Sequence, residues 1–212
     1  KFKEMLNLEM GEIRIGASDM TLQFYLLEVL EQFHEQYPKI KVAVTNAPTP
    51  ETLKHLQNGK IDFGVVSSPI KSRYDWKIKK VRQIEDVFVA GKKFAYLKNH
   101  IFSYKRLETL PILCLEKNTS TRNYVDDFLE KSQVVLSPEF ELATSNMLIQ
   151  FAMKGLGIAS VVKDFAKEYL EREELFLLKF DKQIPVRDFC VVTDERASVS
   201  AAARKLLEII TR

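Results

Sequence analysis

The stretch GEIRIGASDMTLQFYLLEVLEQFHEQYPKIKVAVTNAPTPETLKHLQNGKIDFGVVSSP, residues 11–69, decides the fold, because it predicts strand, helix, strand, helix and strand in turn. Residues 12–17 alternate apolar and charged side chains as a strand does. Residues 21–37 instead repeat apolar side chains at helical spacing and stop at Pro38. Residues 40–45 and 61–66 are again strand-like, and the second of these is nearly continuously apolar, as in a parallel strand covered on both faces. We therefore expect a βαβαβ unit.

Both helices of this stretch begin with residues that can cap them. Ser18 or Asp19 follows the first strand, Thr49 precedes Pro50, and Gly59 supplies a left-handed exit. Parallel strands joined by right-handed crossovers bring strand ends and helix starts to one edge of the sheet. Hydroxyl groups beside free helix amides favour a small polar or anionic ligand, although each residue alone is explained equally well as an ordinary cap. The hydroxyl residues expected at this edge are Ser18, Thr49, Ser67 and Ser68.

The same pattern returns in the second half of the chain. Residues 110–115 predict a strand, Thr121 can cap a helix to Lys131, and residues 134–142 are extended around Pro138. A helix then runs to Lys154, a Gly155/Gly157 pair ends it, and residues 158–162 form another buried strand. This second βαβαβ unit presents its own hydroxyl residues, which are Ser120, Thr121, Thr144 and Ser145.

The last part of the chain is expected to return to the first unit. An amphipathic segment at residues 164–172 and a strand at residues 175–180 close the second half. The strand at residues 186–193 and the helix at residues 198–210 have no local partner, so they complete the first half. The predicted fold is α/β, with two Rossmann-like lobes joined by two crossover strands and a ligand cleft between them. The expected domains are residues 1–10 as the end of a linker helix, residues 11–83 plus 186–212, and residues 84–185.

Composition excludes several classes of protein. A chain of 212 residues that is 46% hydrophobic can bury a sizeable core. No apolar run approaches the roughly 20 residues of a membrane span, and the start of the chain lacks a signal peptide's apolar segment. We expect a cytoplasmic protein with no membrane contact. The net charge of +3 is modest and the charges are interspersed, which is weak support for nucleic-acid binding by this chain.

Cysteines and histidines give no sign of a metal or cofactor. Cys114 and Cys190 lie far apart in apolar, strand-like segments, which favours buried, reduced thiols over a redox pair. His34, His55 and His100 are isolated, without the spacing that holds an ion. We therefore expect neither a metal site nor a cofactor.

Several short runs form a combined pattern across the chain. In the first half they are residues 11–18 followed by 21–27, Tyr37-Pro38, Thr49 before an acidic residue, and LQNGKIDFGVV at residues 56–66. In the second half they are Thr121-Arg122, ELATSNM at residues 141–147 and GLGIA at residues 155–159. Together they resemble the effector-binding domain of LysR-type transcriptional regulators, over essentially the whole chain.

The resemblance implies a periplasmic-binding-protein-like fold of type II that senses a small effector, a carboxylate or an inorganic oxyanion above all. It implies a bacterial regulator whose winged helix-turn-helix precedes Lys1 and binds promoter DNA. Asn146 stands where many members carry an acidic residue and Val162 replaces a frequent proline, which leaves the effector's identity open. The positions that match the family's effector contacts are Ser18, Thr49 and Ser67 in the first lobe and Ser120, Thr121, Thr144 and Ser145 in the second.

One helix also carries a possible interface. Phe24 and Leu27 project opposite its core face, among polar neighbours. Such side chains are often isolated surface residues without meaning. The resemblance favours a homodimer or homotetramer in which this helix packs against a partner subunit, near residues 121–131 of that subunit.

Two other functions are weighed against the regulator. A solute-binding protein of a transport system shares the two-lobed architecture, and an export signal upstream would distinguish it. An enzyme is disfavoured, because the chain lacks a Gly-x-Ser-x-Gly elbow and a phosphate-binding glycine loop, and no histidine is placed to serve Ser18.

Overall fold

The computed structural model describes residues 10–71 and 75–212, which form two compact units. The first unit comprises Lys1–Gln83 and Asp188–Arg212, and the second comprises Ile84–Arg187. The predicted linker helix at residues 1–10 lies outside the described residues, apart from Met10. Among the described residues, no helix is both long and apolar enough to cross a membrane.

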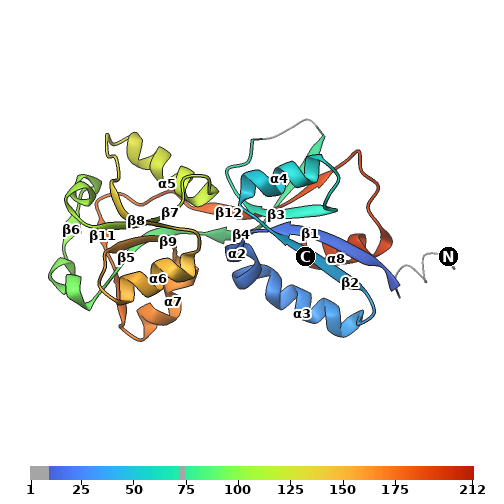
Figure 1. Cartoon of the computed structure of the whole chain (residues 1–212), viewed down its shortest axis with the longest axis horizontal. Helices are drawn as coiled ribbons and strands as arrows, with labels where there is room; N and C mark the ends of the chain where they lie inside the picture. The colour runs from blue at the N-terminus through green and yellow to red at the C-terminus, as the bar shows by residue number, and fades with distance from the viewer. Residues whose placement is uncertain (1–9, 72–74) are drawn as a thin grey trace. The chain divides into compact units, whose positions relative to one another are not determined.

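The sheet of the first unit has the strand order β2-β1-β3-β12-β4. β1 pairs in parallel with β2 and β3, whereas β12 runs antiparallel to β3. Figure 1 shows α4 on one face of this sheet and α3 and α8 on the other. The strands are β1 (Glu12–Ala17), β2 (Lys41–Asn46), β3 (Phe63–Ser67), β4 (Trp76–Ile84) and β12 (Arg187–Asp194), and the helices are α2 (Asp19–Thr21), η1 (Leu22–Leu26), α3 (Leu27–Gln36), α4 (Thr49–Gln57) and α8 (Ala201–Ile210).

The core of the first unit forms where the predicted apolar faces meet. Ile15 of β1, Phe33 of α3 and Leu206 of α8 are fully buried in one cluster. The helix predicted at residues 21–37 is present, but residues 22–26 form a π-helical turn within it. α8 and β12 join this unit, as the lack of a local partner predicts.

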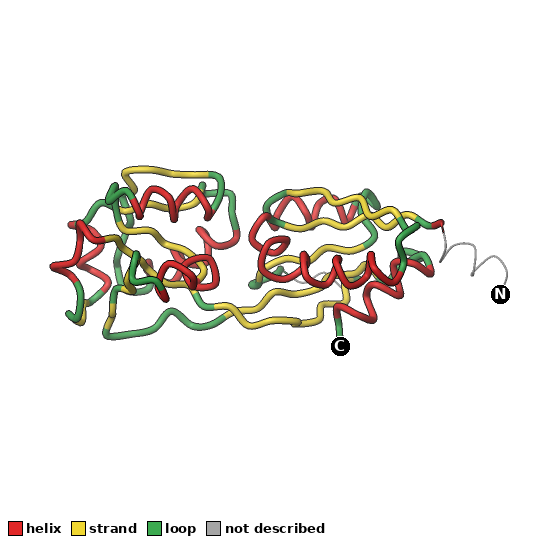
Figure 2. Tube along the Cα trace, turned by 90° about the horizontal axis from the view of Figure 1, so that it is seen from below, coloured by secondary structure: helices red, strands yellow, loops and turns green. Residues whose placement is uncertain are grey.

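The second unit repeats the topology with the order β10-β5-β9-β7-β8. β7 is parallel to β8 and β9, whereas β5 is antiparallel to β9 and β10. Helices lie on either side of the strands in each unit (Figure 2). The strands are β5 (Asp86–Gly91), β7 (Ile112–Leu115), β8 (Pro138–Leu142), β9 (Ile158–Val162) and β10 (Leu175–Leu177), and the helices are η2 (Lys92–Leu97), η3 (Tyr104–Thr109), α5 (Ser120–Glu130), α6 (Ser145–Met153) and α7 (Lys163–Glu171).

One predicted strand is wrong. Residues 175–180 do not form a single strand but two, β10 in the large sheet and β11 (Lys179–Phe180), which pairs with β6 (Ile101–Phe102). The break falls at Leu178, whose amide donates to the carbonyl of Phe88 at 2.9 Å. The apolar run is the same in both parts, so the sequence pattern alone does not show where the chain leaves the sheet.

Candidate functional site

The predicted hydroxyl residues of the first unit lie at the carboxyl ends of neighbouring parallel strands. Ser18 follows β1, Ser67 ends β3 and Ser68 comes next; Thr49 begins the helix after β2. β1 lies between β2 and β3, so these ends meet at one edge of the sheet. Ser67 and Thr49 are buried, whereas Ser18 and Ser68 are half-buried.

Ser18 is a helix cap, as predicted, but Thr49 is not. The hydroxyl oxygen of Ser18 accepts the amide of Thr21 at 3.3 Å. At the second helix Pro48 takes the cap position with extended backbone angles, so Thr49 is already the first helical residue. The helix begins one residue earlier than expected, and Pro50 lies in its first turn, where the amide hydrogen that proline lacks would have no partner within the helix.

The second unit has a matching edge beyond β7 and β8. Thr144 caps α6 as predicted, its hydroxyl oxygen accepting the amide of Met147 at 3.4 Å, and Ser145 is the first helical residue. The prediction that Thr121 caps α5 is wrong. Thr119 does so, with its hydroxyl oxygen accepting the amide of Arg122 at 3.2 Å. Ser120 and Thr121 therefore lie inside the first turn.

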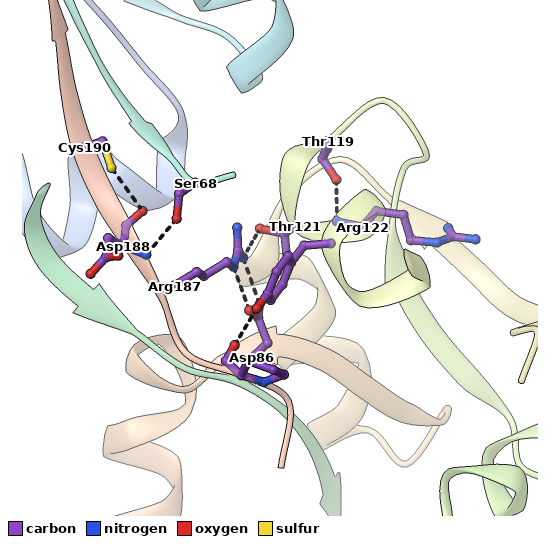
Figure 3. Close-up of polar contacts among 10 residues, drawn as sticks. Ser68, Asp86, Thr119, Thr121, Arg122, Arg187, Asp188 and Cys190 are labelled. Carbon is purple, nitrogen blue, oxygen red and sulfur yellow. Dashed lines mark hydrogen bonds and ion pairs between the residues drawn. The ribbon is translucent and has the colours of Figure 1, made fainter. Parts of the chain in front are cut away.

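A buried ion pair beside Thr121 is the feature that the sequence does not reveal. Arg187 and Asp86 form two parallel bonds, 2.6 Å from Nε to Oδ2 and 2.8 Å from Nη2 to Oδ1 (Figure 3). Their side chains are 2% and 0% exposed. The guanidinium carbon also lies 5.0 Å from the ring centre of Tyr124, whose hydroxyl donates to the carbonyl of Pro185 at 2.6 Å. Asp86 begins β5 and Arg187 begins β12, 101 residues later, so only the fold shows that they meet.

The ion pair fixes how the hydroxyl of Thr121 can act. Arg187 Nη2 donates to Thr121 Oγ1 at 2.8 Å, in a contact buried from solvent. A guanidinium has donors and no acceptor, so the threonine oxygen accepts here and its proton remains available to donate. A ligand at this hydroxyl is favoured if it presents an acceptor, as a carboxylate or oxyanion does.

Arg122 is held within the second unit. Its side chain is 4% exposed and donates to Asp126 at 2.8 Å, to Glu141 at 2.9 Å and to the carbonyl of Leu115 at 2.9 Å. These bonds tie the first turn of α5 to β7 and β8. The guanidinium therefore serves to hold the helix start that carries Thr121.

Asp188 organises the corresponding edge of the first unit. Its amide donates to the hydroxyl of Ser68 at 3.0 Å, and its carboxylate lies 3.1 Å from Lys80 Nζ. The hydrogen bond and the charge of Asp188 raise the pKa of Lys80. Ser68 is therefore fixed by the strand β12 that enters this unit.

Neither cysteine has the surroundings of a reactive thiol. Cys114 and Cys190 are each 1% exposed, which confirms the prediction that they are buried, and they lie in different units. Burial raises the pKa of Cys114 to about 12 and also raises that of Cys190. Among the described residues, no three His, Cys, Asp or Glu side chains come together as metal ligands.

The predicted interface residues differ in exposure. Leu27 is 64% exposed, whereas Phe24 is half-buried in the π-helical turn, where its carbonyl accepts a hydrogen bond from Arg82. Their role between subunits stays a prediction.

Comparison with known proteins places the chain in a family. The profile of the LysR substrate binding domain matches residues 7–212. The activator CmpR of Synechocystis is 24% identical over 156 residues, which cover 74% of this chain and 51% of CmpR. A probable RuBisCO transcriptional regulator of Cyanophora paradoxa is 24% identical over 214 residues, 98% of this chain and 66% of the relative. The chain thus spans about half to two thirds of the length of these relatives.

Solved structures confirm the fold. The regulatory domain of CcmR from Synechocystis, in complex with 2-PG, superposes with a TM-score of 0.84 at 20% identity, over 94% of this chain and 95% of that one. The effector binding domain of QuiR, in complex with shikimate, gives 0.82 at 14% identity, over 96% and 97%. The expected periplasmic-binding-protein-like architecture of type II is therefore present. Because the family profile matches nearly the whole length of this chain, the chain belongs to the LysR substrate binding domain family.

Proposed function

We propose that this chain is the effector-binding domain of a transcriptional regulator and binds a small polar or anionic effector at the hydroxyl-bearing strand ends described above. Family membership supports this reading, and so do the relatives, which are named as transcriptional regulators. The family match does not favour the transporter alternative. In this proposal, DNA binding belongs to parts of the regulator that this chain does not cover. The regulator acts in the cytoplasm, and this domain carries no catalytic activity.

One observation supports the class of effector. The bond from Arg187 to Thr121 leaves the threonine proton to be donated, so the second unit's edge suits an oxygen acceptor. In the first unit Asp19 is exposed beside Ser18 and accepts a hydrogen bond from Asn46, which places a carboxylate near that edge. In the second unit, Thr121 is therefore the proposed contact for an anionic group, whereas Ser18, Thr49, Ser67 and Ser68 are the proposed polar contacts of the first unit. The predicted cleft between lobes stays a prediction.

Signalling follows from differential binding. An effector that binds one conformation of the domain more tightly shifts the population towards it. A coupling free energy of about 1–3 kcal/mol is enough for a several-fold change in DNA affinity.

A thermal-shift screen with small carboxylates, hydroxy acids and inorganic oxyanions tests the proposal. A ligand at about 100 times its dissociation constant stabilises the folded state by about 2.7 kcal/mol, which raises the melting temperature measurably. Thr121→Val keeps the shape of the side chain but removes its donor, so it should abolish the shift, whereas Thr121→Ser should retain it.

The matched control is Thr45→Val, an exposed strand position in the first unit. It should leave the shift unchanged. An effector that stabilises Thr121→Val as strongly as the wild-type protein would contradict the proposed site.

We also propose that the domain associates with a second copy through the helix that carries Phe24 and Leu27. Burial of these apolar side chains is the expected driving force. Leu27→Asp, at an exposed position, and Phe24→Asp should both halve the mass measured by light scattering. Tyr96→Asp, at a 62% exposed position of the second unit, is the control. An unchanged mass in both helix variants would refute this interface.

A further inference from the structure

The second unit contains a hollow that none of the predicted site residues lines. Its volume is about 390 Å³, within the range of small-molecule sites. It lies beside the first residues of β5, on the side of the strand from which β10 departs. Its walls include Asp86, Phe88, Tyr104, Lys179, Lys182 and Ile184.

The hollow exists because the sheet loses a strand there. β10 pairs with β5 only from Leu175 opposite Gly91 to Leu177 opposite Val89. After Leu178 the chain turns away, and Lys179–Phe180 pairs with the short strand β6 instead. The beginning of β5 is therefore left without β10 beside it, and the returning chain passes over the gap.

The apolar wall is rigid. Tyr104 and Phe180 stack with ring centres 4.2 Å apart and planes 8° from parallel, and Phe88 meets Phe180 edge-on at 5.7 Å. The hydroxyl of Tyr104 donates to the carbonyl of Lys182 at 2.7 Å, which fixes the returning segment over the rings. Packed rings held in this way resist collapse into the gap.

The rim of the hollow carries excess positive charge. Lys163 pairs with Glu85 at 3.2 Å, and Asp86 is neutralised by Arg187. Two further lining lysines, Lys179 and Lys182, are exposed, and within the described part of the chain neither takes part in an ion pair. An apolar wall under two such ammonium groups fits a ligand that is flat, apolar and negatively charged at one end.

We propose that this hollow is a second ligand site, which takes a small aromatic carboxylate with its ring against the apolar wall and its carboxylate towards Lys179 and Lys182. Thr121 does not line this site, although the site shares Asp86, which pairs with the Arg187 that donates to Thr121. Its ligand touches residues 85–88, just after the chain enters the second unit, and residues 182–184, shortly before it leaves. Such a ligand is placed to modulate the response to the effector.

Titration with 2-naphthoate, followed by calorimetry and amide chemical shifts, tests this site. The wild-type domain should bind one equivalent, with shifts centred on residues 85–88 and 177–184. The double variant Lys179→Gln/Lys182→Gln should bind about three- to ten-fold more weakly, the effect of losing two solvent-exposed charge contacts. Lys92→Gln/Lys98→Gln changes the net charge equally at two exposed positions of the same unit and should bind like wild type.

Two further arms separate the alternatives. The uncharged 2-naphthylmethanol should bind more weakly than naphthoate and should not respond to the double substitution. Thr121→Val should leave naphthoate affinity unchanged, so failure of the effector proposal and of this one are distinguishable. No binding by the wild type at up to about 10 mM naphthoate would overturn the inference. So would binding that is lost in Thr121→Val and kept in the lysine variant.

Discussion

At the scale of single residues, charged side chains in this protein gain their roles from partners far away in the sequence. Asp86 and Arg187 are 101 positions apart and both nearly inaccessible, yet they form a two-bond ion pair. Breaking such a pair leaves an uncompensated buried charge, which typically costs about 3–5 kcal/mol. The pair therefore also makes the orientation of Thr121 hard to change by a single substitution.

Asp194 gives a pH-dependent prediction. Bonds from the side chain and amide of Arg196, at 2.8–3.0 Å, hold the pKa of Asp194 below its usual value. A lowered folded-state pKa stabilises the fold above the unfolded-state value of about 3.9 and loses that effect as the pH falls through the folded-state pKa. Asp194→Asn should therefore melt below the wild type near pH 7.

The difference between the two melting temperatures should shrink as the pH falls below the unfolded-state pKa of about 3.9 and towards the lowered folded-state pKa of Asp194. Differential scanning calorimetry across this range measures it. A constant difference at all pH values would mean that the carboxylate's charge is not the cause.

The residues of the proposed site show what sequence can and cannot give at this scale. Hydroxyl residues at strand ends are found by position, since parallel topology fixes where those ends lie. Position alone does not show which residue caps each helix, because Thr49 and Thr121, both predicted as caps, lie inside their helices. The bond from Arg187 to Thr121 depends on a strand arriving from the other end of the chain, which no local pattern encodes.

At the scale of elements, the strongest periodic patterns gave the right bounds. β1 and β9 begin and end where predicted, because alternation and continuous apolar runs are direct signals of half-buried and buried strands. The turns η2 and η3 had no such signal. Their backbone is held by contacts with the rest of the second unit, as in the burial of Leu97 and Leu107.

Two glycines, Gly16 near the end of β1 and Gly157 just before β9, should differ in how well they tolerate alanine. A Cβ on Gly157 would lie 2.7 Å from the carbonyl oxygen of Pro111, a backbone atom that accepts the amide of Ile158. A Cβ on Gly16 would instead meet Ile61 Cδ1 at 2.6 Å and Thr52 Cγ2 at 2.7 Å, which are side-chain ends. Gly157→Ala should therefore destabilise the protein by about 1–3 kcal/mol, and Gly16→Ala by less.

Urea unfolding at equal protein concentration measures both variants. Gly16→Ala serves as the matched control, because the substitution is the same and only the neighbouring atoms differ. If Gly16→Ala lowers the free energy of unfolding more than Gly157→Ala does, the packing of Ile61 and Thr52 is less able to adjust than the backbone at Pro111.

At the scale of the whole molecule, the chain builds one topology twice. Three parallel strands with two crossover helices are followed in each sheet by an antiparallel strand, β12 in the first unit and β5 in the second. The repeat was predictable from sequence, as was the return of the chain to its first unit. The route of the returning segment over β5 was not, because residues 175–184 carry no periodicity that marks the departure from the sheet.

The division into units predicts that damage stays local. Leu206 of α8 is fully buried in the core of the first unit. Leu206→Ala should cost about 2–5 kcal/mol by leaving a cavity there. Hydrogen exchange followed by mass spectrometry should then show faster exchange in residues 11–71 and 188–212, with residues 84–187 close to wild type.

The matched variant is Leu129→Ala, at a fully buried position of α5 in the second unit, which should give the reverse pattern. If either change accelerates exchange equally in both units, the chain unfolds as one cooperative block and the two units are not separate in stability.

The hydrogen bonds of Arg187 and Asp188 mark the point along the chain where the second unit ends and the first unit resumes. The side chain of one residue is clamped to Asp86 and Thr121, and the amide of the next is clamped to Ser68. The chain thus passes from the second unit to the first across a single peptide bond, and each of its two residues is held by its own unit. Local unfolding of either unit at this boundary therefore has to break one of these contacts first.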